Sequence, residues 1–184
     1  MKKIDLDTEK KFLEADKLRN KNQFKDAINI LDKIIKKYPE FLPALNNIAL
    51  NYVNIKNFIE AEKYYSICLN LKPEELIFIN NLAKVFHDTN QYKKALPLLQ
   101  KSLMKNKEQL DIIKITAKCL FELDLTKDLD IFLSKVLKKY SDDITLKYYY
   151  GKNLLKINKH IEGLNMLKKT LGVIEFDKKK FKII

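Results

Sequence analysis

The feature that most constrains this chain is a repeat with a period of 34 residues. Small or aliphatic residues recur in two columns that step by this period without an insertion. The first column is Ala15, Ala49, Ala83, Ala117 and Gly151, and the second is Ala27, Ala61, Ala95, Leu129 and Gly163. Two independent columns that keep register through five copies indicate a repeat architecture. The chain is therefore predicted to consist of tandem copies of one structural unit.

Each copy has the pattern of a helical hairpin. Apolar residues recur at spacings of three and four over residues 45–52 and again over residues 61–69, which is the period of an amphipathic helix. A short polar corner, residues 54–57, separates the two segments. Small residues in the two columns allow paired helices to approach closely. One hairpin cannot bury its own apolar face, so we expect successive copies to stack into a solenoid.

The composition agrees with an all-α fold. Of the 184 residues, 46% are hydrophobic and only three are glycine, which leaves little material for turns between strands. No run approaches the ~20 apolar residues of a spanning helix, and the N-terminus lacks the apolar segment of a secretory signal. Cys68 and Cys119 lie outside any Cys/His cluster, so the sequence predicts neither a disulfide nor a zinc site. We expect a cytoplasmic protein with no membrane partner.

A helix–turn–helix unit of this length resembles the tetratricopeptide repeat. The family closes its repeats with a proline, and Pro39 and Pro73 match that place, whereas Lys107 and Ser141 depart from it. The resemblance implies an all-α, α-α superhelix, a right-handed solenoid of helical hairpins. It implies one domain over residues 1–177, followed by a short basic and apolar tail at 178–184. The five repeats would be 8–41, 42–75, 76–109, 110–143 and 144–177.

By this resemblance, the first helix of each repeat lines a concave groove, so residues 34 positions apart would form a stripe along it. One stripe contains Asn47 and Asn81, each preceded by a second asparagine, Asn46 or Asn80. In the repeat domain of O-linked N-acetylglucosamine transferase, an asparagine at this place binds the backbone of an extended peptide. An amide both donates and accepts hydrogen bonds, which suits that role. The alternative is that these asparagines are solvated or cap neighbouring helices.

A second stripe contains Lys84, Lys118 and Lys152. Neighbouring residues expected on the same surface are Lys114, Lys156, Phe121, Tyr148 and His87. Residues 76–184 carry 22 basic and 12 acidic side chains and hold most of the net charge of +12. A basic track in the groove would favour an acidic peptide or a free carboxylate. The alternative is that a lysine-rich composition simply fills solvent positions.

Other functional classes find little support. The five-residue carboxylate clamp of heat-shock co-chaperones does not match the residues here. His87 and Asp88 are adjacent, so on a helix they point about 100° apart and do not converge on one metal ion. Residues 151–153 read "GKN", which lacks the first glycine and the Ser/Thr of a P-loop. With a single arginine and no stacking platform, nucleic-acid binding is not expected. The sequence therefore predicts no enzyme and no cofactor.

These observations predict a non-enzymatic protein–protein interaction scaffold that binds an extended, acidic peptide segment in its concave groove. The predicted ligand residues are Asn46, Asn47, Asn80, Asn81, Lys84, Lys114, Lys118, Tyr148 and Lys152. An alternative follows from the C-terminal end, where "DKKKFKII" is too short to cover the last hairpin and residues 172–176 alternate like a strand. In that alternative the chain is an assembly or accessory module. It would dock through this uncapped end to itself or to a transferase-type enzyme, a glycosyltransferase or a sulfotransferase.

Overall fold

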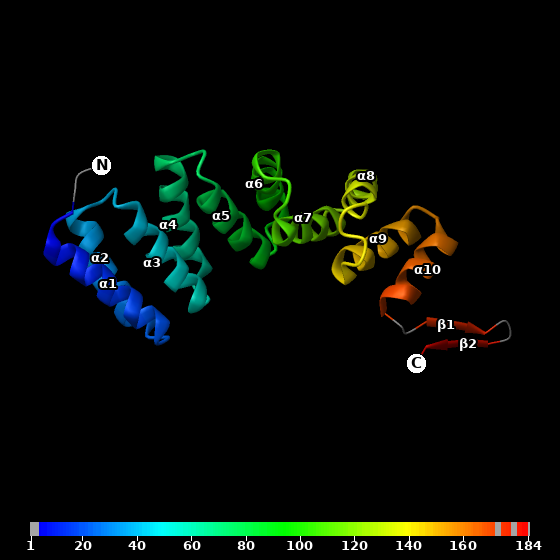
Figure 1. The fold of residues 1–184 in the computed structure, drawn as a ribbon, viewed down its shortest axis with the longest axis horizontal. Coiled ribbons are helices and arrows are strands. Elements are labelled where there is room, and N and C mark those ends of the chain that lie inside the picture. The colour runs from blue at the N-terminus through cyan, green and yellow to red at the C-terminus, as the bar shows by residue number, and fades with distance from the viewer. Residues whose placement is uncertain (1–3, 172–173, 178–179, 184) are drawn as a thin grey trace. The chain divides into compact units, whose positions relative to one another are not determined.

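A computed structural model describes residues 4–171, 174–177 and 180–183. Within these residues the chain forms ten α-helices and one two-stranded sheet (Figure 1). The helices are α1 (Leu6–Asn20), α2 (Phe24–Lys37), α3 (Leu42–Asn54), α4 (Phe58–Leu71), α5 (Leu76–Asp88), α6 (Tyr92–Lys105), α7 (Leu110–Glu122), α8 (Thr126–Val136), α9 (Ile144–Lys156) and α10 (His160–Leu171). The strands are β1 (Ile174–Asp177) and β2 (Lys180–Ile183). The predicted all-α class is confirmed, with a small β-hairpin after the last helix.

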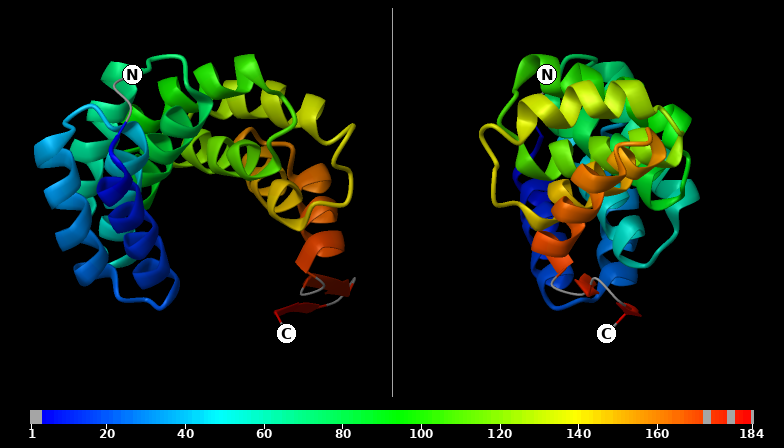
Figure 2. Two further views of the ribbon diagram at one scale, coloured as in Figure 1. Left: turned by 60° about the vertical axis from the view of Figure 1, so that its left-hand side comes forward. Right: turned by 90° about the vertical axis from the view of Figure 1, so that its right-hand side faces the viewer.

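The helices pair into hairpins, because each odd-numbered helix contacts the even-numbered helix that follows it. Hairpins also stack on their neighbours, through α2 on α3, α4 on α5 and α8 on α9 (Figure 2). Every member of the two small-residue columns is buried. In the first three hairpins both members are alanine, for example Ala49 of α3 and Ala61 of α4, both 0% exposed. The columns thus mark the helix contacts, as the sequence predicted.

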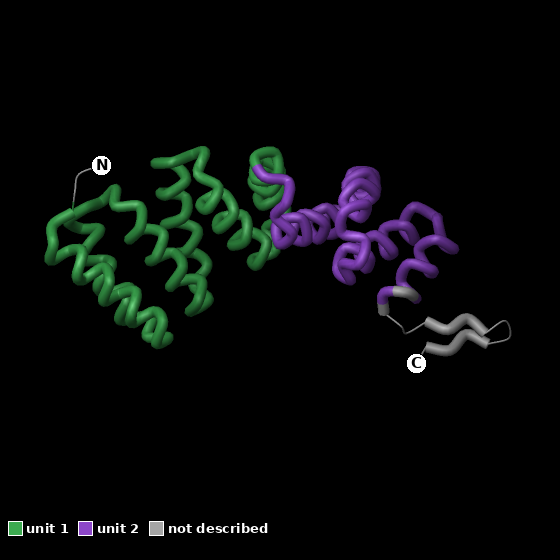
Figure 3. Tube along the Cα trace, viewed as in Figure 1, with its two compact units in different colours: residues 1–105 green, residues 106–184 purple. Residues whose placement is uncertain are grey.

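The chain divides into two compact units, Met1–Lys105 and Asn106–Ile184 (Figure 3). Unit 1 contains α1 to α6, and its core includes Leu31 and Ile48. Unit 2 contains α7 to α10 and the β-hairpin, and its core includes Leu133. The single domain predicted over residues 1–177 stays a prediction.

Each hairpin turns through one residue in the left-handed region of backbone space. These residues recur every 34 positions with φ between 57° and 64°, and they are Asn22, Lys56, Asn90, Asp124 and Asn158. In the first hairpin the N–H of Asn22 donates to Arg19 O and the N–H of Gln23 donates to Leu18 O, both at 2.9 Å. This is the bond pattern of a Schellman motif, which satisfies the last carbonyls of a helix. Asn and Asp tolerate this conformation better than other non-glycine residues, so Lys56 is the exception.

Ion pairs join the segment before the first helix of a hairpin to the C-terminal part of its second helix or to the residues just after it. The pairs are Asp5–Lys37, Glu74–Lys101, Glu74–Lys105 and Glu108–Lys139. Hydrogen bonds from Lys101 and Lys105 lower the pKa of Glu74 to about 2. The hydrogen bond from Lys37 likewise holds the pKa of Asp5 far below its ordinary value. These carboxylates are exposed, so each pair contributes a modest, salt-sensitive stabilisation.

The last hairpin packs closely at its crossing. Both column members there are glycine, Gly151 on α9 and Gly163 on α10. A Cβ atom added to Gly163 would lie 2.9 Å from the carbonyl oxygen of Gly151 and 2.9 Å from Cδ2 of Leu155. Such distances are shorter than van der Waals contact, so glycine is required for the observed approach of α9 and α10.

The C-terminal β-hairpin pairs β1 with β2 in antiparallel register, which places Glu175 opposite Lys182. Strand β1 contacts α10. The strand pattern predicted for residues 172–176 is confirmed where the structure describes it, and residues 172 and 173 lie outside the described residues. Docking of a partner through this end of the chain stays a prediction.

Candidate functional site

The predicted ligand residues all lie on the first helix of their hairpins, as expected, and they are shared between the two units. Those of unit 1 lie on α3 and α5, and those of unit 2 lie on α7 and α9. The unit 1 residues are Asn46, Asn47, Asn80, Asn81 and Lys84, and the unit 2 residues are Lys114, Lys118, Tyr148 and Lys152.

The amide of Asn47 is engaged within unit 1. Its Nδ2 donates to Oδ1 of Asp16 at 2.8 Å, and its Oδ1 accepts from Nη1 of Arg19 at 3.5 Å. Arg19 also pairs with Asp16 at 3.2 Å on α1. The Asn47 side chain is buried, with 9% exposure. Its polar atoms therefore link α3 to α1.

The other asparagines of unit 1 also bond within the chain. Nδ2 of Asn81 on α5 donates to Oδ1 of Asn46 on α3 at 3.2 Å. Oδ1 of Asn80 accepts from the hydroxyl of buried Ser102 on α6 at 2.5 Å. The bond from Asn81 uses one of its two N–H donors and leaves its carbonyl oxygen as an acceptor. Lys84 is half-buried on the same helix.

In unit 2, Lys152 lies on an aromatic surface. Its Nζ donates to Oη of Tyr148 at 3.0 Å and lies 4.9 Å from the centroid of that ring. The same ammonium lies 5.2 Å from the ring centroid of Phe121 on α7. The negative face of an aromatic ring attracts a cation. Lys152 thus connects α9 to α7 through ring contacts.

Lys156, one helical turn further along α9, approaches the same ring. Its Nζ lies 4.2 Å from the Phe121 centroid and 2.8 Å from Oδ1 of Asp124. Tyr149 packs between these groups, with its centroid 5.6 Å from that of Phe121 and 5.4 Å from that of Tyr148. We call this cluster the α7–α9 face, and its members are Phe121, Tyr148, Tyr149, Lys152 and Lys156.

The lysines near this face differ in their carboxylate partners. Lys114 on α7 pairs with Asp143 at 2.7 Å. Burial opposes ionisation of Asp143, but the Lys114 hydrogen bond and the Leu146 N–H outweigh it and lower its pKa. Among the described residues, neither Lys118 nor Lys152 has a carboxylate within ion-pair distance.

Lys118 precedes Phe121 by three positions, so both lie on one side of α7. The α7–α9 face, with Lys118 beside it, therefore combines flat apolar surface with two ammonium groups, those of Lys118 and Lys152, that have no carboxylate partner among the described residues. This arrangement is suited to an anionic group that brings apolar surface with it.

Comparisons with known proteins agree with this architecture. The profile of the tetratricopeptide repeat family matches residues 42–75, one of the five predicted repeats. The described hairpins repeat that unit on either side of it, in the order and spacing predicted. The described hairpins have the fold of tetratricopeptide repeats. Curated protein sequences gave no match.

Solved structures share the tetratricopeptide fold over most of their length. One is YrrB, described as a TPR protein with an unusual peptide-binding site, with a TM-score of 0.78 and 20% identity over 86% of this chain and 81% of that chain. Another is MamA from Desulfovibrio magneticus RS-1, with a TM-score of 0.84 and 12% identity over 92% and 96%. A further MamA structure has a TM-score of 0.82 and 18% identity over 90% of each chain. At these identities the likeness concerns the fold, and the coarse function that a tetratricopeptide fold implies is a protein–protein interaction scaffold.

Other side chains with possible chemistry lie outside the predicted ligand residues. Nδ1 of His87 and Oδ1 of Asp88 lie 2.8 Å apart at the end of α5. Burial raises the pKa of the Cys68 and Cys119 thiols to about 12, which makes them poor nucleophiles. The described residues hold no group of three or more His, Cys, Asp or Glu placed to bind a metal ion. No helix among them is long and apolar enough to cross a bilayer.

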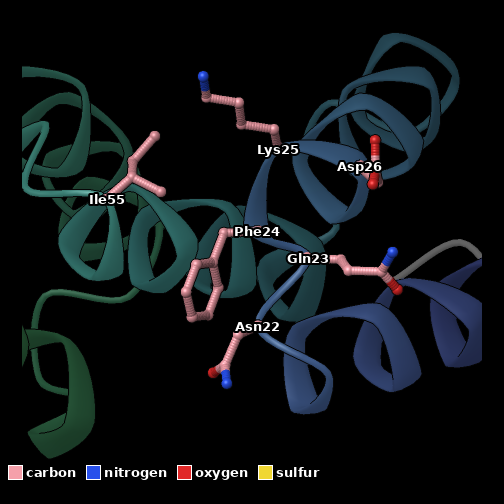
Figure 4. A pocket seen from close by; sticks show the side chains of 6 residues that line it. All are labelled: Asn22, Gln23, Phe24, Lys25, Asp26 and Ile55. Carbon is pink, nitrogen blue, oxygen red and sulfur yellow. The ribbon is translucent and has the colours of Figure 1, made fainter.

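Figure 4 shows a surface pocket at the corner of the first tetratricopeptide hairpin. Its lining residues are Asn22, Gln23, Phe24, Lys25, Asp26 and Ile55. None of the predicted ligand residues lines it, and it belongs to unit 1. It is therefore separate from the α7–α9 face.

Several residues that contact the predicted ligand residues or their neighbours were not predicted from the sequence to do so. Tyr149 completes the aromatic cluster, and its only signal was its place in the run of three tyrosines. Asp124 and Asp143 neutralise two of the lysines, and Asp16 and Arg19 engage Asn47. These pairings join residues 20 or more positions apart, so the spacing of charges along the sequence did not reveal them.

Proposed function

We propose that this protein is a protein–protein interaction module that binds an extended, acidic peptide segment, with the α7–α9 face as the principal contact. The observation that carries the proposal is Lys152, a half-buried lysine between two aromatic rings with no carboxylate partner among the described residues. A carboxylate arriving from a partner would supply the missing charge. Because the ammonium is already positioned, little side-chain entropy would be lost on binding.

Two further observations support this proposal. Lys118 adds a second uncompensated charge on the same side of α7 as Phe121, so the positive surface extends beyond a single side chain. YrrB, a structure with the same fold, is described as having a peptide-binding site. A peptide ligand is therefore in keeping with what this fold can bind.

The remaining predicted residues would have supporting roles. Lys114 would contribute less, because its charge is paired with Asp143. Asn81 keeps an acceptor and a donor for a peptide backbone, whereas the Asn47 amide is occupied by Asp16 and Arg19. Asn46, Asn80 and Lys84 stay predictions, as does the cytoplasmic location.

The experiment compares two labelled peptides by fluorescence anisotropy with the full chain. In one peptide glutamate alternates with serine, and in the other glutamine replaces every glutamate. The proposal expects tighter binding of the glutamate peptide and a loss of that preference as salt rises. Lys152→Gln should weaken binding of the glutamate peptide roughly three- to tenfold, which corresponds to about 0.7–1.4 kcal/mol for one charge-assisted contact.

The control is Lys127→Gln, which removes the same charge from an exposed position on α8. It should leave the affinity nearly unchanged. Equal binding of the two peptides, or equal losses in the two variants, would overturn the proposal.

A further inference from the structure

Two lysines of the α7–α9 face converge on one aromatic ring but differ in their partners. Lys152 and Lys156 are four residues apart on α9, hence on the same side of the helix. Their ammonium groups lie 5.2 and 4.2 Å from the centroid of Phe121. Lys152 donates to the neutral hydroxyl of Tyr148, whereas Lys156 is paired with the carboxylate of Asp124 at 2.8 Å. Lys152 therefore has no carboxylate partner among the described residues, whereas the charge of Lys156 is neutralised by Asp124 of the same chain.

The backbone at position 124 does not require a carboxylate. Asp124 is the left-handed residue of the corner between α7 and α8, with φ 57°. Its own N–H donates to Phe121 O at 3.1 Å, as the corner geometry demands. Asparagine holds the equivalent corner at Asn22, Asn90 and Asn158. The fold is therefore served by asparagine equally well, and the carboxylate has a consequence of its own, the neutralisation of Lys156.

The ion pair is open to competition. The Asp124 side chain is 75% exposed and that of Lys156 is 39% exposed. Exposed ion pairs are weak because water and salt screen both charges. A partner carboxylate that contacts Lys156 must replace Asp124 there, and it also meets the repulsion of the Asp124 charge. Asp124 thus opposes an acidic partner at one lysine and leaves the other accessible.

Building on the proposed function, we propose that Asp124 is a specificity-determining residue that acts as an internal competitor for acidic segments at Lys156. In the native chain a single partner carboxylate, the one at Lys152, gains full attraction. A second carboxylate beside it gains little, because it only exchanges with Asp124. Asp124 therefore sets both the affinity of the α7–α9 face for an acidic peptide and the number of glutamates in the peptide that increase this affinity.

The test is Asp124→Asn, which keeps a residue suited to the corner and removes the charge. Anisotropy titrations would use two peptides in a serine background, one with a single glutamate and one with two glutamates. Asp124→Asn should tighten binding of the two-glutamate peptide about two- to fivefold, in line with the strength of an exposed ion pair. The one-glutamate peptide should gain less. In a Lys156→Gln background the gain should disappear, because no cation is left to release.

The control for net charge is Asp128→Asn, an exposed carboxylate on α8. It should leave both affinities nearly unchanged. An equal gain in this control, or no gain in Asp124→Asn while native binding still depends on Lys152, would overturn this inference and leave the proposed function standing. If neither peptide binds the native chain or Asp124→Asn, both the proposed function and this inference fail.

Discussion

The first helices of the hairpins carry polar residues in both units, but the two units use these residues in opposite ways. In unit 1 the amides of Asn47 and Asn81 bond to neighbouring helices, and the charge of Arg19 is paired with Asp16. In unit 2 the Lys152 ammonium lies on aromatic rings without a carboxylate among the described residues. A polar group already satisfied within the chain gains little from a partner. The difference therefore places the expected binding energy in unit 2.

The asparagine stripe and the lysine stripe of the sequence explain this difference between the units. The column that holds Asn47 and Asn81 in unit 1 continues as Ile115 and Tyr149 in unit 2. Amides that can bond across the stack are thereby replaced by apolar and aromatic surface. The lysine column runs through both units, as Lys84 in unit 1 and as Lys118 and Lys152 in unit 2, and the aromatic rings accompany it in unit 2.

The largest expected effect concerns the packing of the two helices within one hairpin. Gly163→Val should lower the free energy of unfolding by roughly 2–3 kcal/mol, because its Cβ would press against the Gly151 carbonyl at 2.9 Å. Ala61→Val at the equivalent position of unit 1 should be better tolerated, because that hairpin already accommodates a Cβ atom at both column positions, Ala49 and Ala61. Urea unfolding followed by circular dichroism measures both. Equal losses in the two variants would contradict the requirement for glycine at the α9–α10 crossing.

The next effect separates charge from amide recognition. Lys118→Glu should weaken binding of the glutamate peptide about tenfold and spare the glutamine peptide. Asn81→Ala should weaken both peptides by the same factor, at most about fivefold, the value of one net hydrogen bond. Anisotropy titrations with Lys127→Glu as the control make this comparison. A loss that is the same for both peptides in Lys118→Glu would refute the charge-based part of the account.

Much of this architecture could be predicted from the sequence, and the reason is geometric. Packing positions such as Ala49 and Ala61 recur at a fixed step, because every hairpin makes the same contacts with its neighbours. The lysine column could be predicted in the same way, because Lys84, Lys118 and Lys152 recur at the same step. The partners of Asn47 and Lys156 were not, since hydrogen bonds and ion pairs depend on rotamers and on loop positions that no period fixes. Asp124 illustrates this, because its contact with Lys156 joins side chains 32 positions apart.

A smaller effect is expected at the hairpin corners, where unit 1 carries the one unsuited residue. Lys56 has φ 59°, a conformation that costs a lysine more than an asparagine. Lys56→Asn should raise the free energy of unfolding by roughly 0.5–1 kcal/mol. Asn158→Lys in unit 2 should lower it by a similar amount. Thermal unfolding of the two variants measures both changes in stability. Changes of the same sign in the two variants would contradict this explanation of the corner residues.

The smallest effects per residue concern acid stability. Hydrogen bonds from lysines lower the pKa values of Glu74 in unit 1 and Glu108 in unit 2 below those of an unfolded chain. Their contribution is therefore complete above about pH 5 and is lost as the pH falls toward the folded values, about 2 for Glu74. Glu74→Gln should flatten the fall in stability between pH 5 and 2. Urea midpoints across this range measure it, and a slope unchanged from the native chain would argue against the Glu74 pairs.

The central claim, that an acidic segment binds principally to unit 2 and only secondarily to the asparagines of unit 1, has one direct test. A glutamate peptide carrying a photoreactive group is crosslinked to the full chain, and mass spectrometry locates the adducts. The account predicts adducts in α7 and α9. Their yield should be reduced in Lys152→Gln and should stay at the native level in the Lys127→Gln control. Adducts concentrated in α3 and α5, formed equally well by the glutamine peptide, would contradict it.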